Sequence, residues 1–315
     1  MPFLKDKINS LTKEYHFYFQ IKALAIEDKI KVGNVEFTFF SENEIADLYA
    51  NAKESNPERT FDEFKSIYDN FFGAITAFVK IKGVLERANE IAFQEAELAV
   101  DVLKLFCCYY STEKLIQMFE IDYRFNHGSS TQFLQLPNGD IKDSIIQIKN
   151  LSGNVPVQLT NDFIKNAKAV GLDTFSQFIK DKKETELYFI TIDLIKQLST
   201  IISTHNNYEK TVKSISLFES FCVAKNSSQA KGETILKQKI IPKLFSNKDT
   251  VTLVGLIRKH YEIRDKYLHN YIQLPLNKRE LAILLEYQRF FILKIIELNK
   301  QFVSLADILA YFSIQ

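Results

Sequence analysis

The segment Thr185–Ser203 reads TELYFITIDLIKQLSTIIS, and the pattern of the chain changes at this segment. Its apolar residues fall on nearly every side of a helix, which predicts a helix that is buried on several sides or that meets another protein. Residues from about 160 onward have helical periodicity almost throughout, whereas many earlier runs alternate between apolar and polar residues. We therefore expect an α+β fold class, with a mixed N-terminal domain followed by an all-α bundle.

The helical part contains further expected helices on both sides of this segment. Asn161 is a suitable N-cap for a helix that ends near Gly171. Asn277 and Glu280 stand at the N-cap and N3 positions of the last long helix, a spacing typical of a helix start. Apolar residues at three- and four-residue spacing predict the remaining helices, so the expected ranges after Ser203 are 208–223, 233–245, 250–269 and 277–302.

The first 150 residues mix strand and helix patterns. Alternating apolar residues predict strands over 15–22, 35–39 and 74–82, and Gly33-Asn34 predicts a hairpin turn before the second of these. Helices are expected at 42–53 and 86–106, and two β-like runs at 131–136 and 141–148 flank a Pro-Asn-Gly turn. We place an N-terminal domain, with a sensing or regulatory role, at 1–175 and the all-α domain at 184–315.

Composition agrees with this division into two domains. A chain of 315 residues suggests about two domains at roughly 150 residues each. Its 9 glycines and 6 prolines make up about 5% of the residues, which favours long helices over an all-β fold. We find no apolar run long enough for a membrane span. The first charged residues are not followed by the apolar stretch that a secretory signal needs. The 3 cysteines include no CxxC pair. We expect a soluble cytoplasmic protein that does not contact a membrane.

The charge of the chain is uneven. Residues 1–175 carry 19 Lys and Arg against 25 Asp and Glu, a net charge of −6, whereas residues 176–315 carry 21 against 14, a net charge of +7. A basic C-terminal half can attract a polyanion through its phosphates. The alternative is an uneven surface charge without functional meaning.

Several standard catalytic motifs are absent from the sequence. The chain has no GxxxxGK(S/T) phosphate loop, no GxGxxG, no HExxH and no GxSxG. Its five histidines include no i,i+4 pair and no Cys/His cluster at metal-ligand spacing. We therefore expect no metal and no cofactor.

Two charged residues occupy positions in apolar stripes. Arg264 continues the stripe of Val254, Ile257 and Tyr261 at spacings of three and four, and Glu219 holds the same kind of position in the helix expected at 208–223. A guanidinium in such a position is costly unless it is paired. We expect Arg264 and Glu219 to meet, and a bidentate pair would fix the arginine. The alternative is an ordinary buried ion pair that sets helix register.

His269 lies near the expected end of the same helix. His269 follows Arg264 by five residues, which places the two side chains about 140° apart around the helix axis. They therefore do not share a face of a straight helix. Asp265 does share a face with His269 and could accept its ring N–H. If the helix ends at Asn270, His269 lies in its last turn near a cleft. The alternative for His269 is a favourable cation at a helix C-terminus.

The pair Arg264 and His269, with Asp265 after the arginine, resembles the Arg-x4–6-His motif of HEPN domains (higher eukaryotes and prokaryotes nucleotide-binding). These domains are all-α, and the motif lies at the end of a later helix that another long helix follows. The segment Ser216–Phe221, which contains Glu219, looks like the Leu-Glu segment of ApeA-like HEPN domains. The resemblance covers about 184–312 and is loose for residues 1–175.

This resemblance implies an enzyme, a metal-independent endoribonuclease that works as a homodimer, in a family that includes many toxins and anti-phage effectors. Arg264 would hold the scissile phosphate of the RNA, His269 would act as general acid or base, and Asp265 and Glu219 would support them. The RNA 2′-OH would be the nucleophile and a 2′,3′-cyclic phosphate the product, so DNA would not be cut. Two copies of the motif would converge at a two-fold interface.

Tyr271 adds a second parallel. Arg264, His269 and Tyr271 together resemble the Arg-x4-His-x-Tyr form of HEPN toxins whose small nucleotidyltransferase antitoxins modify that tyrosine with AMP. Tyr271 is then a candidate modification site, and an antitoxin or regulatory protein a candidate partner, whereas the alternative is a core or interface aromatic.

Two other functions stay open at this point. One is a non-catalytic HEPN module that binds RNA, nucleotide or a partner protein. The other is a structural interaction protein that uses the apolar helix Leu187–Ile202.

Overall fold

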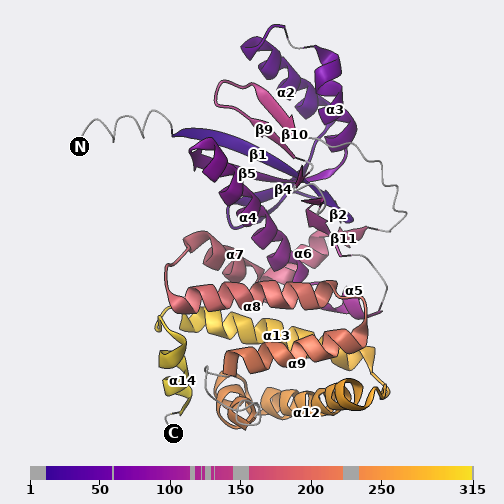
Figure 1. The fold of residues 1–315 in the computed structure, drawn as a ribbon, viewed down its shortest axis with the longest axis vertical. Coiled ribbons are helices and arrows are strands. Elements are labelled where there is room, and N and C mark those ends of the chain that lie inside the picture. Colours follow the sequence, from indigo (N-terminus) through magenta and orange to yellow (C-terminus); the bar gives the residue numbers. More distant parts are fainter. Residues whose placement is uncertain are drawn as a thin grey trace, which may run out of the picture. The chain divides into compact units, whose positions relative to one another are not determined.

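A computed structural model describes residues 12–58, 60–113, 118–121, 123–124, 129–130, 132–144, 156–222 and 234–313 (Figure 1). The chain divides into two compact units, one of Met1–Val100 with Met118–Lys180 and one of Asp101–Gln117 with Asp181–Gln315. The first is α+β and the second is helical, as the sequence predicts. The division after Lys180 falls between the two expected domains, 1–175 and 184–315, but residues 101–117 group with the helices and not with the N-terminal domain.

The first unit is built on an antiparallel sheet of seven strands. Its order is β10-β9-β1-β5-β4-β3, with β6 also pairing β1. The strands are β1 (Lys13–Lys22), β3 (Ile30–Val32), β4 (Val35–Phe39), β5 (Ile75–Gly83), β6 (Glu120–Ile121), β9 (Gln132–Gln135) and β10 (Ile141–Ser144). Phe17 pairs with Val79 in the central β1–β5 register. Gly33, at φ 62°, makes the predicted hairpin turn between β3 and β4.

Two short pairs of strands accompany this sheet. β2 (Leu24–Ile26) pairs in parallel with β11 (Val157–Leu159), and β7 (Tyr123–Arg124) pairs with β8 (Ser129–Ser130). Position 131 and positions 145–148 of the two predicted β runs lie outside the described residues.

Helices cover the sheet and extend the core of the first unit. They are α2 (Glu42–Ser55), α3 (Phe61–Phe71), most of α4 (Leu85–Lys104), α6 (Asn161–Ala169) and α7 (Leu172–Asp181). Phe93 of α4 makes an edge-to-face contact with Phe19 of β1 at 5.8 Å between ring centroids. A second cluster joins α2, α3 and β10 through Leu48, Phe64 and Ile141. The N-cap of α6 is Thr160 and not Asn161, because the Thr160 hydroxyl accepts the N–H of Phe163.

The second unit is a bundle in which α8, α13, α9 and α12 lie side by side (Figure 1). Its elements are α5 (Cys108–Glu113), α8 (Glu186–Ser203), α9 (Asn207–Cys222), the π-helix η1 (Leu236–Ile240), α11 (Ile241–Leu244), α12 (Asn247–Asn270), α13 (Lys278–Leu298) and α14 (Leu305–Ser313). The Asn277 side chain caps α13 as predicted. The apolar helix α8 is buried against α5, α9, α13 and α14, which explains why its apolar residues lie on several sides.

The described part of the chain contains no helix with the length and hydropathy that crossing a membrane requires.

Candidate functional site

The predicted meeting of Arg264 and Glu219 occurs between α12 and α9. Arg264 Nη1 donates to Glu219 Oε1 at 2.8 Å, and only 8% of Arg264 and 7% of Glu219 are exposed. Both residues occupy the inward stripe of their helices, and for this reason the packing of α12 on α9 brings them together. The pair is not bidentate, because a single guanidinium nitrogen of Arg264 bonds a single carboxylate oxygen of Glu219.

Tyr261 is a residue of this cluster that sequence reasoning treated only as part of the stripe. Its hydroxyl donates to the same Glu219 Oε1 at 2.8 Å. Its ring lies against the guanidinium, with Arg264 Cζ 5.0 Å from the ring centroid. Tyr261 precedes Arg264 by three residues and therefore lies beside it on the helix. A tyrosine three residues before a stripe arginine is the signal that could have identified it.

The guanidinium has three different environments for its nitrogens. Nη1 is bonded to Glu219, and Nε is buried, 3.5 Å from Asp265 Oδ1 and without a hydrogen bond to any described residue. Nη2 is also unbonded within the described part of the chain, but it is not enclosed. Burial lowers the pKa of Arg264, but the hydrogen bond and charge of Glu219 outweigh it and leave the pKa raised. Arg264 therefore carries a permanent charge, and its Nη2 has no hydrogen-bond partner among the described residues.

His269 lies in the last turn of α12, which ends at Asn270 as predicted. The imidazole is exposed. The expected contact with Asp265 is wrong, because no hydrogen bond or ion pair joins Asp265 to His269 among the described residues. The carboxylate of Asp265 turns instead toward the charged guanidinium of Arg264, which attracts it more strongly than an imidazole.

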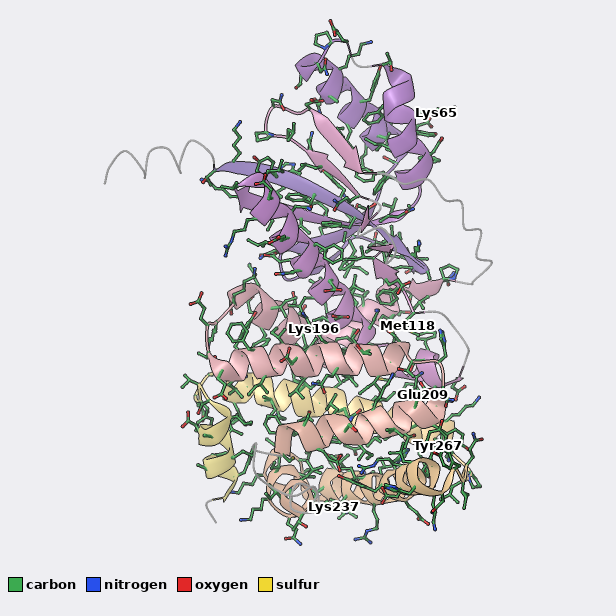
Figure 2. The ribbon with its side chains drawn as sticks, viewed as in Figure 1. Lys65, Met118, Lys196, Glu209, Lys237 and Tyr267 are labelled. Carbon is green, nitrogen blue, oxygen red and sulfur yellow. The ribbon has the colours of Figure 1, made fainter. Side chains whose placement is uncertain are left out.

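The C-terminal end of α12 exposes apolar side chains around His269. Tyr271 is 90% exposed, and Leu268 and Ile272 are 44% and 50% exposed. Tyr271 is therefore not the core aromatic that was one of the alternatives for it. It ends the helix at φ 55°, a left-handed conformation that favours glycine. The neighbouring Tyr267 stacks on Tyr208 of α9 at 5.4 Å between centroids, at the end of the bundle where Figure 2 labels Tyr267 and Glu209.

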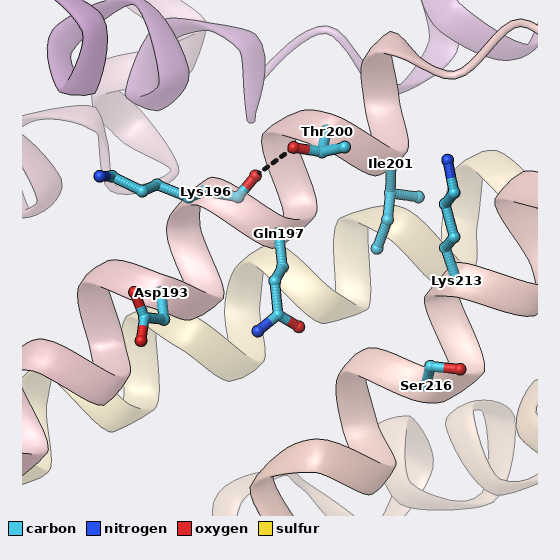
Figure 3. Close-up of a pocket in the computed structure, with 7 residues that line it drawn as sticks. All are labelled: Asp193, Lys196, Gln197, Thr200, Ile201, Lys213 and Ser216. Atoms are coloured by element: carbon cyan, nitrogen blue, oxygen red, sulfur yellow. Dashed lines mark hydrogen bonds between the residues drawn. The ribbon is translucent and has the colours of Figure 1, made fainter.

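The predicted cleft at His269 does not coincide with either of two cavities in the bundle. One, of about 350 Å³, lies between α8 and α9, where Figure 3 shows Lys196 and Lys213 on its walls. The other, of about 560 Å³, lies between α11, the start of α12, and α13, and includes Tyr287. Arg264 and His269 line neither of these two cavities. No group of three or more metal-ligating side chains occurs in the described residues.

Comparisons with protein-family models, with curated proteins and with solved structures found no match for this chain.

Proposed function

We propose that the helical unit is a metal-independent endoribonuclease of the HEPN type that acts as a homodimer in the cytoplasm. The observation that carries this proposal is how the guanidinium of Arg264 is held. Glu219 and Tyr261 fix its guanidinium, and Nη2 is left without a hydrogen bond to any described residue, five residues before the exposed His269. A fixed, permanently charged donor is what binding of a phosphate requires.

The reaction uses only groups of the protein and of the RNA. His269 accepts the proton of a 2′-OH, or donates one to the leaving 5′ oxygen. The 2′ oxygen forms a bond to phosphorus while the bond from phosphorus to the 5′ oxygen breaks, which yields a 2′,3′-cyclic phosphate and a 5′-OH. Arg264 stabilises the charge that develops on the phosphate oxygens. Glu219 and Asp265 hold the guanidinium and do not touch the reacting atoms.

A second copy of the chain explains two features of α12. His269 lies about 140° from Arg264 round the helix, so one chain directs the two groups differently. The apolar side chains of Leu268, Tyr271 and Ile272, close to His269 in the sequence, are exposed in the single chain. A two-fold contact through this end of α12 would cover them and would bring together groups from both copies. An antitoxin or regulatory partner that covers Tyr271 would block the same contact.

Cleavage of RNA by the purified protein tests the proposal. We expect Arg264→Ala to reduce the rate about 10²-fold or more, and His269→Ala about 10²- to 10⁴-fold. Matched controls are Arg258→Ala and His205→Ala, which remove an exposed arginine of the same helix and an exposed histidine before α9. These controls keep full activity. Cleavage that survives both Arg264→Ala and His269→Ala contradicts the proposed site.

A non-catalytic module that binds RNA is the second candidate. The observation that favours it is that Glu219 already balances the charge of Arg264 and that neither cavity includes the pair. This function predicts RNA affinity that falls steeply with salt, without any cleavage product.

A further inference from the structure

Tyr261 contacts a second cation besides Arg264. Lys237 Nζ lies 5.5 Å from the centroid of the Tyr261 ring, and Arg264 Cζ lies 5.0 Å from the same centroid. The lysine and the guanidinium are therefore no farther apart than the sum of these two distances. Each is attracted by the electron-rich ring. A single buried tyrosine thus holds two positive charges from separate elements close to one ring.

The element that carries Lys237 has an unusual backbone. Residues Leu236–Ile240 form a π-helix, in which Ile241 donates its N–H to the carbonyl of Leu236 five residues earlier. Pro242 follows and has no N–H to donate to the carbonyl of Gln238, so the normal α pattern is interrupted here. Short π segments are frequent at functional sites because they rotate side chains out of the α-helical register. Leu236 and Ile240 are fully buried and anchor this turn, whereas Lys237 is half-buried (Figure 2).

The charges near Lys237 and Arg264 favour binding of more than one phosphate. Glu219 is bonded to Nη1 of Arg264 and Asp265 lies 3.5 Å from its Nε, so Nη2 is the nitrogen left without a partner among the described residues. Lys237 adds a positive charge on a different element, next to the same ring. A mononucleotide with one phosphate can use only one of the two cations well, whereas a polynucleotide strand presents charges in succession.

We propose that Lys237 binds a phosphate neighbouring the one that Arg264 binds, so that the site takes a single-stranded RNA segment of at least two linkages. This inference rests on the proposed function, because it assumes that Arg264 binds the scissile phosphate. Lys237 is a binding residue in this assignment and takes no part in proton transfer. Tyr261 is the positioning residue that sets the spacing of the two cations.

The test measures binding of an RNA oligonucleotide that carries 2′-O-methyl groups throughout, because this probe cannot be cleaved through the 2′-OH. Fluorescence anisotropy at several KCl concentrations gives the slope of log affinity against log salt. On a single strand, the magnitude of that slope falls by about 0.7 for each phosphate that the protein no longer neutralises. We expect Lys237→Ala to reduce the slope by about 0.7 and to weaken binding several-fold at low salt.

Three variants make the result specific. Lys239→Ala removes an exposed lysine two residues away and leaves the slope unchanged. Lys237→Arg keeps the charge and its attraction to the Tyr261 ring, and it restores the wild-type slope. Tyr261→Phe keeps the ring but removes the hydroxyl that bonds Glu219, so it preserves the contribution of Lys237 to the slope.

Two outcomes overturn the assignment of Lys237. They are an unchanged slope in Lys237→Ala, and equal reductions of the slope in Lys237→Ala and Lys239→Ala. Cleavage of unmodified RNA is measured in parallel so that the two proposals can fail separately. If RNA is cleaved and the slope of Lys237→Ala is unchanged, the role of Lys237 is rejected and the proposed nuclease activity is retained. A slope that depends on Lys237 without any cleavage supports the binding site and rejects the nuclease.

Discussion

Helix α9 places charged groups in two buried regions of the bundle. The two regions shift the pKa of a buried cation in opposite directions. Near the C-terminal end of α9, Glu219 pairs with Arg264 and leaves the pKa of the arginine raised. Near its N-terminal end, Lys210 is 1% exposed and donates to the carbonyl of Ser111 in α5. No carboxylate pairs with Lys210 among the described residues, and burial lowers its pKa to about 8.

The difference shows what a counter-ion does inside this bundle. Arg264 is a fixed charge at every pH that a ribonuclease meets, because its partner Glu219 offsets the cost of burial. Lys210 interacts electrostatically with the buried thiol of Cys108, whose own pKa burial raises to about 12, and the guanidinium of Arg289 acts on the same thiol. Arg289 is 4% exposed and stacks on Phe106 and Phe290. The region around Arg264 therefore suits binding of an anion, whereas the region around Lys210 is a structural interior in which a lysine changes its charge with pH.

Removal of Glu219 should have the largest effect on stability. Glu219→Ala leaves Arg264 buried without its counter-ion, and we expect a loss of about 3–5 kcal/mol in the free energy of unfolding. The measurement is urea unfolding followed by circular dichroism. The control is the double variant Glu219→Ala with Arg264→Met, which removes the uncompensated charge and should recover a large part of the loss. A single variant whose unfolding free energy falls by less than about 1 kcal/mol contradicts the role of the ion pair.

Lys210→Met should reveal the second region through pH. Below pH 8, folded and unfolded wild-type chains both hold the proton, so the full cost of burying the charge is present. Between pH 8 and 10.5 the unfolded chain binds more protons than the folded one, so the stability of the wild type rises relative to the variant. We expect the difference to change by up to about 3 kcal/mol across this window.

Two features allow the effect of Lys210 to be separated from the effects of other titrating groups. The buried thiols of Cys107, Cys108 and Cys222 also titrate at alkaline pH, but they are present in both proteins and largely cancel in the difference. Lys213→Met, at an exposed position of the same helix, should show no such window. A difference between wild type and Lys210→Met that stays flat from pH 8 to 10.5 shows that Lys210 is charged or solvated in the folded state at all these pH values.

Tyr271→Gly should stabilise the chain and weaken the proposed dimer. The residue adopts a left-handed conformation at φ 55° while 90% of its surface is exposed, so glycine relieves strain and removes little packing. We expect a gain of about 1 kcal/mol in thermal unfolding analysed at low protein concentration. Sedimentation velocity of the same variant should show a larger dissociation constant than the wild type. Lower stability of the isolated chain would indicate that the tyrosine packs more closely than its exposure suggests.

His269→Ala should have the smallest effect on folding. The imidazole is exposed and makes no hydrogen bond within the described residues, so the free energy of unfolding should change by less than about 0.5 kcal/mol. Reduced activity with unchanged stability separates His269 from Glu219. A large destabilisation by His269→Ala would assign the histidine to the fold.

The stripe pattern was sufficient to predict the contact of Arg264 with Glu219, because an inward position on two packed helices leaves few other places for either charge. The end of α12 at Asn270 was also predictable from its local sequence. The sequence favoured His269 as the partner of Asp265, because residues four apart on a helix lie beside each other whereas adjacent residues do not. The partner in the structure is the adjacent Arg264. That choice depends on which group holds a permanent charge in the folded bundle.

Long-range packing accounts for the rest of what the sequence did not predict. The helix α3 and the grouping of Asp101–Gln117 with the bundle depend on contacts across many residues. The carbonyl of Ser111 meets Lys210, 99 positions away, and neither residue belongs to a motif. Lys237, which lies near the Tyr261 ring, belongs to a π-helix, whose backbone pattern breaks the periodicity on which helix prediction relies.

The most direct test of the proposed chemistry uses a DNA oligonucleotide that contains one ribonucleotide. We expect cleavage only at the linkage that follows the ribose, with a 2′,3′-cyclic phosphate on the product identified by mass spectrometry. The well-folded His269→Ala variant should not form this product. Cleavage at deoxyribose linkages, or the same cyclic product from His269→Ala at the wild-type rate, would contradict the proposed chemistry.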